Sequence, residues 1–146
     1  MIAHECVHTQ QTVPLDKNAI GCTLLNAVMK EGFCDFIGEL MAGDQINKVA
    51  LTYGNQHEKA LWKEFKSEMC SDHTANWLYN YGTTKDRPAD LGYYIGYKIA
   101  EAYYKNAADK TQAIKDIIEM NNPLDFLERS GYDQQVKTNQ TSSVAK

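Results

Sequence analysis

The chain has 146 residues, of which 43% are hydrophobic and 23% are charged, and its formal net charge is −4. These values are typical of one globular domain with a core. They argue against nucleic acids and anionic membranes as partners, because the sequence contains no basic block. No stretch has the length and apolar character of a transmembrane helix.

The first predicted helix spans residues 1 to about 12 and carries His4, Glu5 and His8 in the spacing HExxH. The two histidines lie one turn apart, so both imidazoles point to one side and can hold the same metal ion. Glu5 points away from that line and can act as a general base on a metal-bound water. The alternative is a helix that carries two histidines on one face by coincidence.

The second predicted helix begins near Asn18 or Thr23 and ends at Met41. It carries Glu31 and Asp35 on a face that is otherwise rich in apolar residues. Two helices joined by a short turn pack antiparallel, so Glu31 can face the two histidines. A lone carboxylate is rarely buried without a partner. We therefore expect Glu31 as the third metal ligand and Asp35 as the acceptor of a hydrogen bond from a ligand imidazole.

Two alternatives to this ligand set remain open. Both carboxylates could be ordinary surface residues at a helix edge. His73, in an irregular segment, could replace Glu31 as the third ligand, since histidine is a common zinc ligand. His57 lies in a polar segment and is expected to be exposed.

Shorter elements are predicted for the middle of the chain. One helix is expected over residues 45–53 and a second over 55–70, separated by Gly54, and residues 71–85 are expected to be irregular. No two cysteines have the CxxC spacing of a zinc site. Cys6 and Cys34 are expected to be buried free thiols, and the sequence does not indicate whether any of the four cysteines pair.

The next strong helix is predicted from Asp86, as the N-cap, to about Asn106, with Pro88 in its first turn. Gly92 and Gly96 lie on one face of this helix among other small residues. A glycine inside a helix costs up to about 1 kcal/mol relative to alanine. Two glycines on one face therefore indicate that another backbone packs very close there.

Two further helices are predicted, the first from Asp109 to Met120 and the second from Asn122 to Arg129, followed by a stop at Gly131. The polar tail over residues 133–146 is expected to be disordered. No segment has a pattern that predicts a β-strand, so none is expected. The predicted fold is all-α, a helical bundle around the HExxH metal helix, formed by a domain over residues 1–132.

Three blocks of the sequence occur in a specific order, namely HECVHTQ (4–10), EGFCD (31–35) and DRPADLGYYIGYKI (86–99). Together they resemble the gluzincin arrangement of zinc metallopeptidases. More narrowly, they resemble the bacterial family of predicted zinc-dependent proteases related to gliding-motility lipoproteins. The chain then looks like the helical part of a zincin-like α+β fold whose upstream sheet is missing, so we expect an N-terminally truncated domain and a missing upstream segment of the same protein.

The reaction that this resemblance implies is hydrolysis of a peptide or protein substrate by a zinc-activated water, with Glu5 as the general base. Tyr97, or its neighbour on the helix Tyr93, is the expected donor to the oxyanion. Arg87 and Tyr93 are the expected substrate-binding residues, with a local ion pair as the alternative for Arg87. The alternative function is a non-catalytic or truncated zinc-binding helical module that acts through protein contacts. Glu5 favours the enzyme, because a structural zinc site needs no base.

Overall fold

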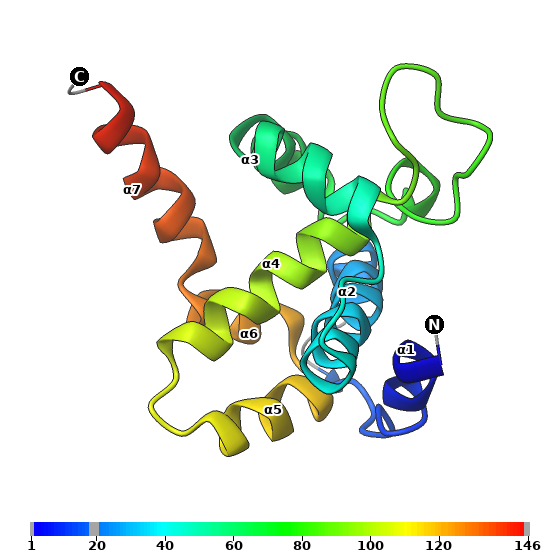
Figure 1. Ribbon diagram of the computed structural model, residues 1–146, viewed down its shortest axis with the longest axis vertical. Helices are drawn as coiled ribbons and strands as arrows, with labels where there is room; N and C mark the ends of the chain where they lie inside the picture. Colours follow the sequence, from blue (N-terminus) through cyan, green and yellow to red (C-terminus); the bar gives the residue numbers. More distant parts are fainter. Residues whose placement is uncertain (1, 18–20, 145–146) are drawn as a thin grey trace.

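The computed structural model describes residues 2–17 and 21–144, and every regular element in these ranges is helical (Figure 1). The elements are α1 (Ile2–His8), α2 (Thr23–Ala42), α3 (Lys48–Glu68), the 3-10 turn η2 (Thr74–Asn76), α4 (Leu91–Asn106), α5 (Lys110–Ile118), α6 (Pro123–Ser130) and α7 (Tyr132–Val144). The all-α prediction is therefore confirmed for the described residues. None of these helices combines the length and the apolar character that crossing a membrane requires.

Helix α2 runs through the middle of the molecule and is contacted by α1, α4, α5 and α6 (Figure 1). It begins at Thr23, and the alternative start near Asn18 lies outside the described residues. Its fully buried side chains are Leu24, Leu25, Val28, Met29, Phe33 and Cys34. A helix that is covered on several sides is apolar around most of its circumference. Asp35 is only 3% exposed within this surface, so its carboxylate needs a polar partner.

Helices α2 and α4 cross at a point where two glycines let their backbones touch. A Cβ atom on Gly32 would collide with the backbone of Gly96 and Tyr97, and one on Gly96 would collide with the backbone of Val28. The close backbone contact predicted from the small residues of α4 is therefore confirmed. Glu31 directly precedes Gly32 in the sequence, so the helix crossing also fixes the position of the Glu31 side chain on α2.

Helix α3 differs from the prediction, which divided this region at Gly54. The helix is continuous over Lys48–Glu68 and contains a kink at His57, whose φ and ψ are −124° and 17°. A Cβ atom on Gly54 would collide with the ring of Tyr94 from α4. Gly54 therefore allows two helices to pack and does not end one.

Helix α4 begins at Leu91, and the predicted N-cap at Asp86 is wrong. Asp90 precedes the helix with a left-handed φ of 59°. Its backbone N–H donates to the side-chain oxygen of Asn80 at 2.8 Å, and its carboxylate accepts from the backbone N–H of Asn80 at 3.4 Å. This reciprocal pair closes the loop before the helix, so the segment with Pro88 belongs to the loop.

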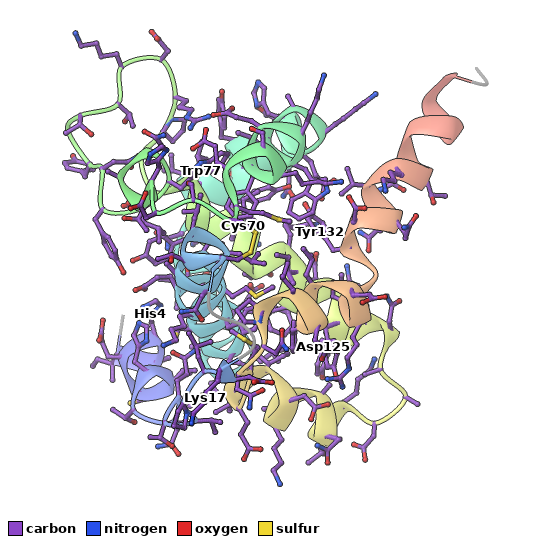
Figure 2. The ribbon with its side chains drawn as sticks, turned by 180° about the vertical axis from the view of Figure 1, so that it is seen from behind. His4, Lys17, Cys70, Trp77, Asp125 and Tyr132 are labelled. Carbon is purple, nitrogen blue, oxygen red and sulfur yellow. A yellow bond between two sulfur atoms is a disulfide. The ribbon has the colours of Figure 1, made fainter. Side chains whose placement is uncertain are left out.

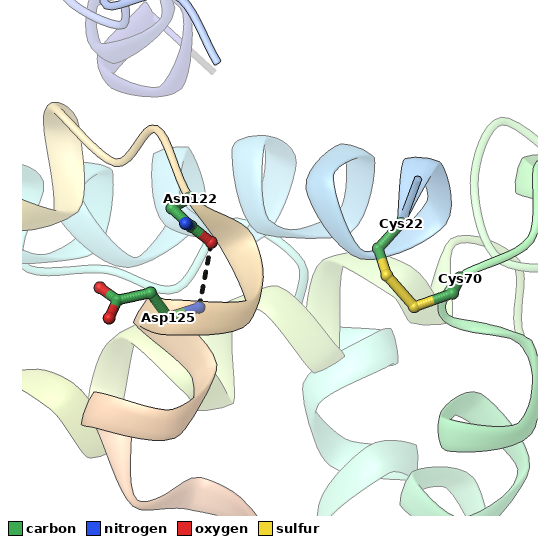
Figure 3. Close-up of a disulfide and its surroundings, with 4 residues drawn as sticks. All are labelled: Cys22, Cys70, Asn122 and Asp125. Atoms are coloured by element: carbon green, nitrogen blue, oxygen red, sulfur yellow. Dashed lines mark hydrogen bonds between the residues drawn. A yellow bond between two sulfur atoms is a disulfide. The ribbon is translucent and has the colours of Figure 1, made fainter. Parts of the chain in front are cut away.

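A disulfide between Cys22 and Cys70 ties the start of α2 to the chain just after α3 (Figure 3). Next to it, the backbone N–H of Leu24 donates to the carbonyl of Ser71 at 3.0 Å. The two free cysteines differ from each other, because Cys34 is buried as predicted whereas Cys6 is exposed. The prediction for Cys6 is wrong because α1 turns that side chain away from α2.

Helix α6 follows the local signals of the sequence. The side chain of Asn122 accepts a hydrogen bond from the backbone N–H of Asp125 at 3.1 Å, which caps the helix (Figure 3). Gly131 ends it with a φ of 70°. Both boundaries agree with the prediction.

The chain continues as helix α7, where the sequence predicted a disordered tail from Asp133. Tyr132 and Val136 are buried, and the carboxylate of Asp133 accepts hydrogen bonds from Trp62 and Lys66 of α3, both at 2.8 Å. These contacts hold the first turns of α7, and its C-terminal part extends away from the other helices (Figure 1). The polar composition of this segment did not predict its contacts with α3, because the partner residues are distant in the sequence.

Candidate metal centre

Helix α1 lies antiparallel along α2, as predicted, although α1 already ends at His8 and the connection over residues 9–22 is longer than the expected short turn. His4 contacts Asp35, and in the segment after α1 the side-chain amide of Gln11 donates to the carbonyl of Lys30 at 3.1 Å. Gly38 lies at this contact, because a Cβ atom there would be 3.4 Å from the backbone nitrogen of His4 and 2.8 Å from Cδ1 of Ile46. Figure 2 shows His4 on the side of α1 that is next to α2.

Three donor atoms from these two helices lie close together. The Nε2 atoms of His4 and His8 are 3.0 Å apart, and each lies 3.3 Å from Oε2 of Glu31. A tetrahedral zinc ion that is about 2.0–2.2 Å from its nitrogen and oxygen ligands holds those atoms about 3.3 Å apart. The three donor atoms therefore have the spacing that one divalent ion would require of its ligands.

Asp35 orients His4 from the opposite side of the ring. His4 is 7% exposed, and its Nδ1 lies 2.7 Å from Oδ1 of Asp35. When the Nδ1–H donates to this carboxylate, the Nε2 atom turns its lone pair towards Glu31. Asp35 is held in turn by a hydrogen bond from the side-chain amide of Asn47.

His8 has two partners at its Nδ1 atom, namely Oε1 of Gln11 at 3.0 Å and Sγ of Cys34 at 3.3 Å. An Nδ1–H that donates to Gln11 leaves the Nε2 atom free for a metal ion. Cys34 forms a second possible ligand set with the two histidines, since their donor atoms lie within 4.8 Å of one another. The sulfur of Cys34 faces Nδ1 of His8, whereas Oε2 of Glu31 faces the Nε2 atoms of both histidines. Glu31 is therefore the better third ligand.

Glu31 is an anion held between the histidines and two tyrosines. Burial alone raises its pKa, but hydrogen bonds from His4 and Tyr79 outweigh this effect, and the pKa of Glu31 falls from 4.5 to about 2. While Oε2 faces the imidazoles, Oε1 accepts a hydrogen bond from the hydroxyl of Tyr79. Tyr93 is a further neighbour, because its ring centroid is 6.0 Å from that of His4, and burial and the charge of Glu31 raise the pKa of its hydroxyl.

The structure thus brings His4, His8, Glu31 and Asp35 together, with Tyr93 beside them. Tyr79 is the member of this group that the sequence did not suggest. It lies in an irregular segment, where no periodicity indicates which way a side chain points.

The other candidate residues lie elsewhere or have other partners. The Tyr97 hydroxyl donates to Glu39 at 2.5 Å. Arg87 donates to both carboxylate oxygens of Glu64, at 3.0 and 2.9 Å, and its guanidinium lies 4.8 Å from the centroid of the Trp77 ring. This is the local ion pair that the sequence left open for Arg87.

The remaining ionisable candidates are exposed. Glu5 is exposed on α1, between the two histidines in sequence. His73 is also exposed, next to Asp72, and does not join the cluster. His57 is exposed as predicted, and its Nδ1 atom lies 2.9 Å from the carbonyl oxygen of Tyr53.

A comparison with known families matches residues 1–122 to a family with the description "predicted Zn-dependent protease". The matched range includes both helices of the candidate metal centre and all of α4. Among the curated proteins and among the solved structures, no match was found. Because the match spans most of the chain, the protein belongs to the family of predicted Zn-dependent proteases (DUF2268).

Proposed function

We propose that the protein is a gluzincin-like zinc metallopeptidase in which His4, His8 and Glu31 hold the metal. The proposal rests on one observation above all, the triangle of donor atoms with sides of 3.0, 3.3 and 3.3 Å on two packed helices. Two imidazoles and one carboxylate are the ligands of many catalytic zinc sites, which leave a fourth position open. Bound zinc would acidify a water molecule and polarise the carbonyl of the scissile peptide bond.

Glu5 is the proposed general base. Its carboxylate is exposed on the same helix as the two histidines, so solvent and substrate can reach it. It takes a proton from the attacking water and passes that proton to the leaving amine. Because Glu5 directly follows His4, the helix fixes its distance from the cluster.

Tyr93 is the better-placed tyrosine for a contact with substrate. Burial raises the pKa of its hydroxyl, and the charge of Glu31 adds to this, so Tyr93 stays protonated and can donate a hydrogen bond to a developing oxyanion. For Tyr97 and Arg87 to act on substrate, their hydrogen bonds to Glu39 and Glu64 would first have to open. Their roles in oxyanion and substrate binding stay predictions.

The test combines zinc content with hydrolysis of a peptide library. We expect about one zinc per parent chain, together with cleavage. Glu5→Gln should keep the zinc and lose at least about 100-fold in hydrolysis, the usual contribution of a general base. His8→Ala should lose both zinc and activity. His57→Ala, which removes an exposed histidine of α3, is the matched control and should behave like the parent.

The outcomes separate the enzyme from its alternative. Zinc binding without hydrolysis in the parent would contradict the proposed activity and favour a zinc-binding helical module. Equal zinc content in His8→Ala and the parent would contradict the metal site itself.

A further inference from the structure

Tyr79 lies between two anchored residues in the segment that connects η2 to α4. Leu78 is 1% exposed, and Asn80 is 5% exposed and hydrogen-bonded to Asp90. Tyr79 itself is 70% exposed, so its side chain contributes little to the core. Its backbone φ is 56°, in the left-handed region that bulky side chains rarely adopt. Such strained positions persist where the surroundings hold them, and they gather at functional sites.

The hydroxyl of this exposed tyrosine reaches the candidate metal ligand. It donates a hydrogen bond to Oε1 of Glu31, whereas Oε2 of the same carboxylate lies 3.3 Å from the Nε2 atoms of His4 and His8. A phenol is protonated at neutral pH and a carboxylate can only accept, so Tyr79 is the donor of this hydrogen bond. The oxygen of Glu31 that faces away from the histidines is thereby occupied.

We propose that Tyr79 is a positioning residue of the metal centre, which makes Glu31 bind the metal through one oxygen and so sets the metal affinity. The inference rests on the proposed zinc site of His4, His8 and Glu31. A side chain that is mostly exposed, on a strained backbone, adds little to folding. Its contact with the partly buried carboxylate of Glu31 is therefore better explained by the metal site than by the stability of the loop.

The same loop provides a matched control. Tyr81 is 90% exposed, lies two positions further along, and has no hydrogen bond among the contacts of the described residues. Tyr79→Phe removes only the hydroxyl that reaches Glu31, and Tyr81→Phe removes a hydroxyl without a protein partner. Tyr79→Asn removes the phenol and places in the left-handed region a residue that tolerates it.

The experiment measures zinc affinity by competition with a chromophoric chelator, the visible spectrum of the Co²⁺-loaded protein, and the Tm of the metal-free protein. Loss of a hydrogen bond to a metal ligand typically costs 10- to 100-fold in metal affinity. We expect a loss of about this size, with an altered Co²⁺ spectrum, for Tyr79→Phe and Tyr79→Asn. Tyr81→Phe should match the parent, and the Tm of metal-free Tyr79→Asn should be no lower than that of the parent.

A zinc affinity and a Co²⁺ spectrum of Tyr79→Phe that match the parent would overturn the inference about Tyr79 without contradicting the zinc site. An equal loss of affinity in Tyr81→Phe, or a matching fall in the metal-free Tm of Tyr79→Phe, would also overturn it, because either would indicate a general effect on the loop. Absence of zinc binding in the parent would overturn the proposed function and this inference together.

Discussion

The pKa of His4 predicts how the stability of the metal-free protein depends on pH. Hydrogen bonds to Asp35 and Glu31 outweigh the burial of the ring and raise the pKa of His4 from 6.5 to about 9. One pKa unit corresponds to about 1.4 kcal/mol, so protonated His4 stabilises the metal-free fold by up to about 3 kcal/mol. Because folding raises this pKa, the stabilisation is complete below pH 6.5 and is lost as the pH rises through about 9.

The perturbation that tests this effect is Asp35→Asn, which removes the charge of the main hydrogen-bond acceptor. The free energy of unfolding of the chelator-treated parent should fall by up to about 3 kcal/mol as the pH rises from 6.5 to about 9. The Asp35→Asn variant should show a much smaller fall, because its His4 titrates closer to the ordinary pKa. The difference between the two profiles isolates His4 from other groups that titrate in this range.

The assay is urea unfolding at a series of pH values, combined with an NMR titration of the imidazole protons. His57→Ala is the control, since it removes an exposed imidazole. A His4 titration midpoint near 6.5 in the metal-free parent, or parallel stability profiles in the parent and Asp35→Asn, would refute the reasoning.

Three further predictions concern the scaffold. Gly96→Ala forces a Cβ atom against the backbone of Val28, so the free energy of unfolding, measured by chemical denaturation, should fall by about 1–3 kcal/mol or more. An unchanged denaturation midpoint would contradict the close helix crossing. Cys70→Ser removes a disulfide between residues 48 positions apart and should lower the free energy of unfolding by about 4 kcal/mol through loop-closure entropy. An unchanged Tm after reduction of the parent would contradict the disulfide. Asp133→Asn should speed hydrogen exchange in α7. The pKa of Asp133 is lowered, since hydrogen bonds from lysines and a tryptophan outweigh its burial, so the anchoring of α7 should weaken as the pH falls below the usual aspartate range.

Local patterns in the sequence predicted the part of the site that two neighbouring helices supply. The HExxH spacing places His4 and His8 on one face, and a second helix that follows closely in the sequence was expected to pack antiparallel. These two facts are sufficient to bring Glu31 and Asp35 to the histidines. The small residues of α4 likewise predicted a close backbone contact, although one helix cannot reveal that Gly32 is its partner.

The remaining features depend on contacts between distant segments. Asn80 pairs with Asp90 and so moves the start of α4 beyond the Asp86-x-Pro88 signal, which local preference favours. Tyr79 reaches Glu31 from an irregular loop, where no repeat of side-chain direction exists. Helix α7 depends on α3, because Asp133 binds Trp62 there, and a polar composition does not indicate such a partner.

The most direct test of the account is the zinc content of the purified chain and of its Glu31→Ala variant, measured by elemental analysis. We expect about one zinc per parent chain and a large loss of zinc in the variant, since Glu31 is one of the three proposed ligands. Far-UV circular dichroism of both proteins would establish that the helices are retained. A parent chain without zinc, or a folded Glu31→Ala variant that retains it fully, would contradict the three-ligand metal centre.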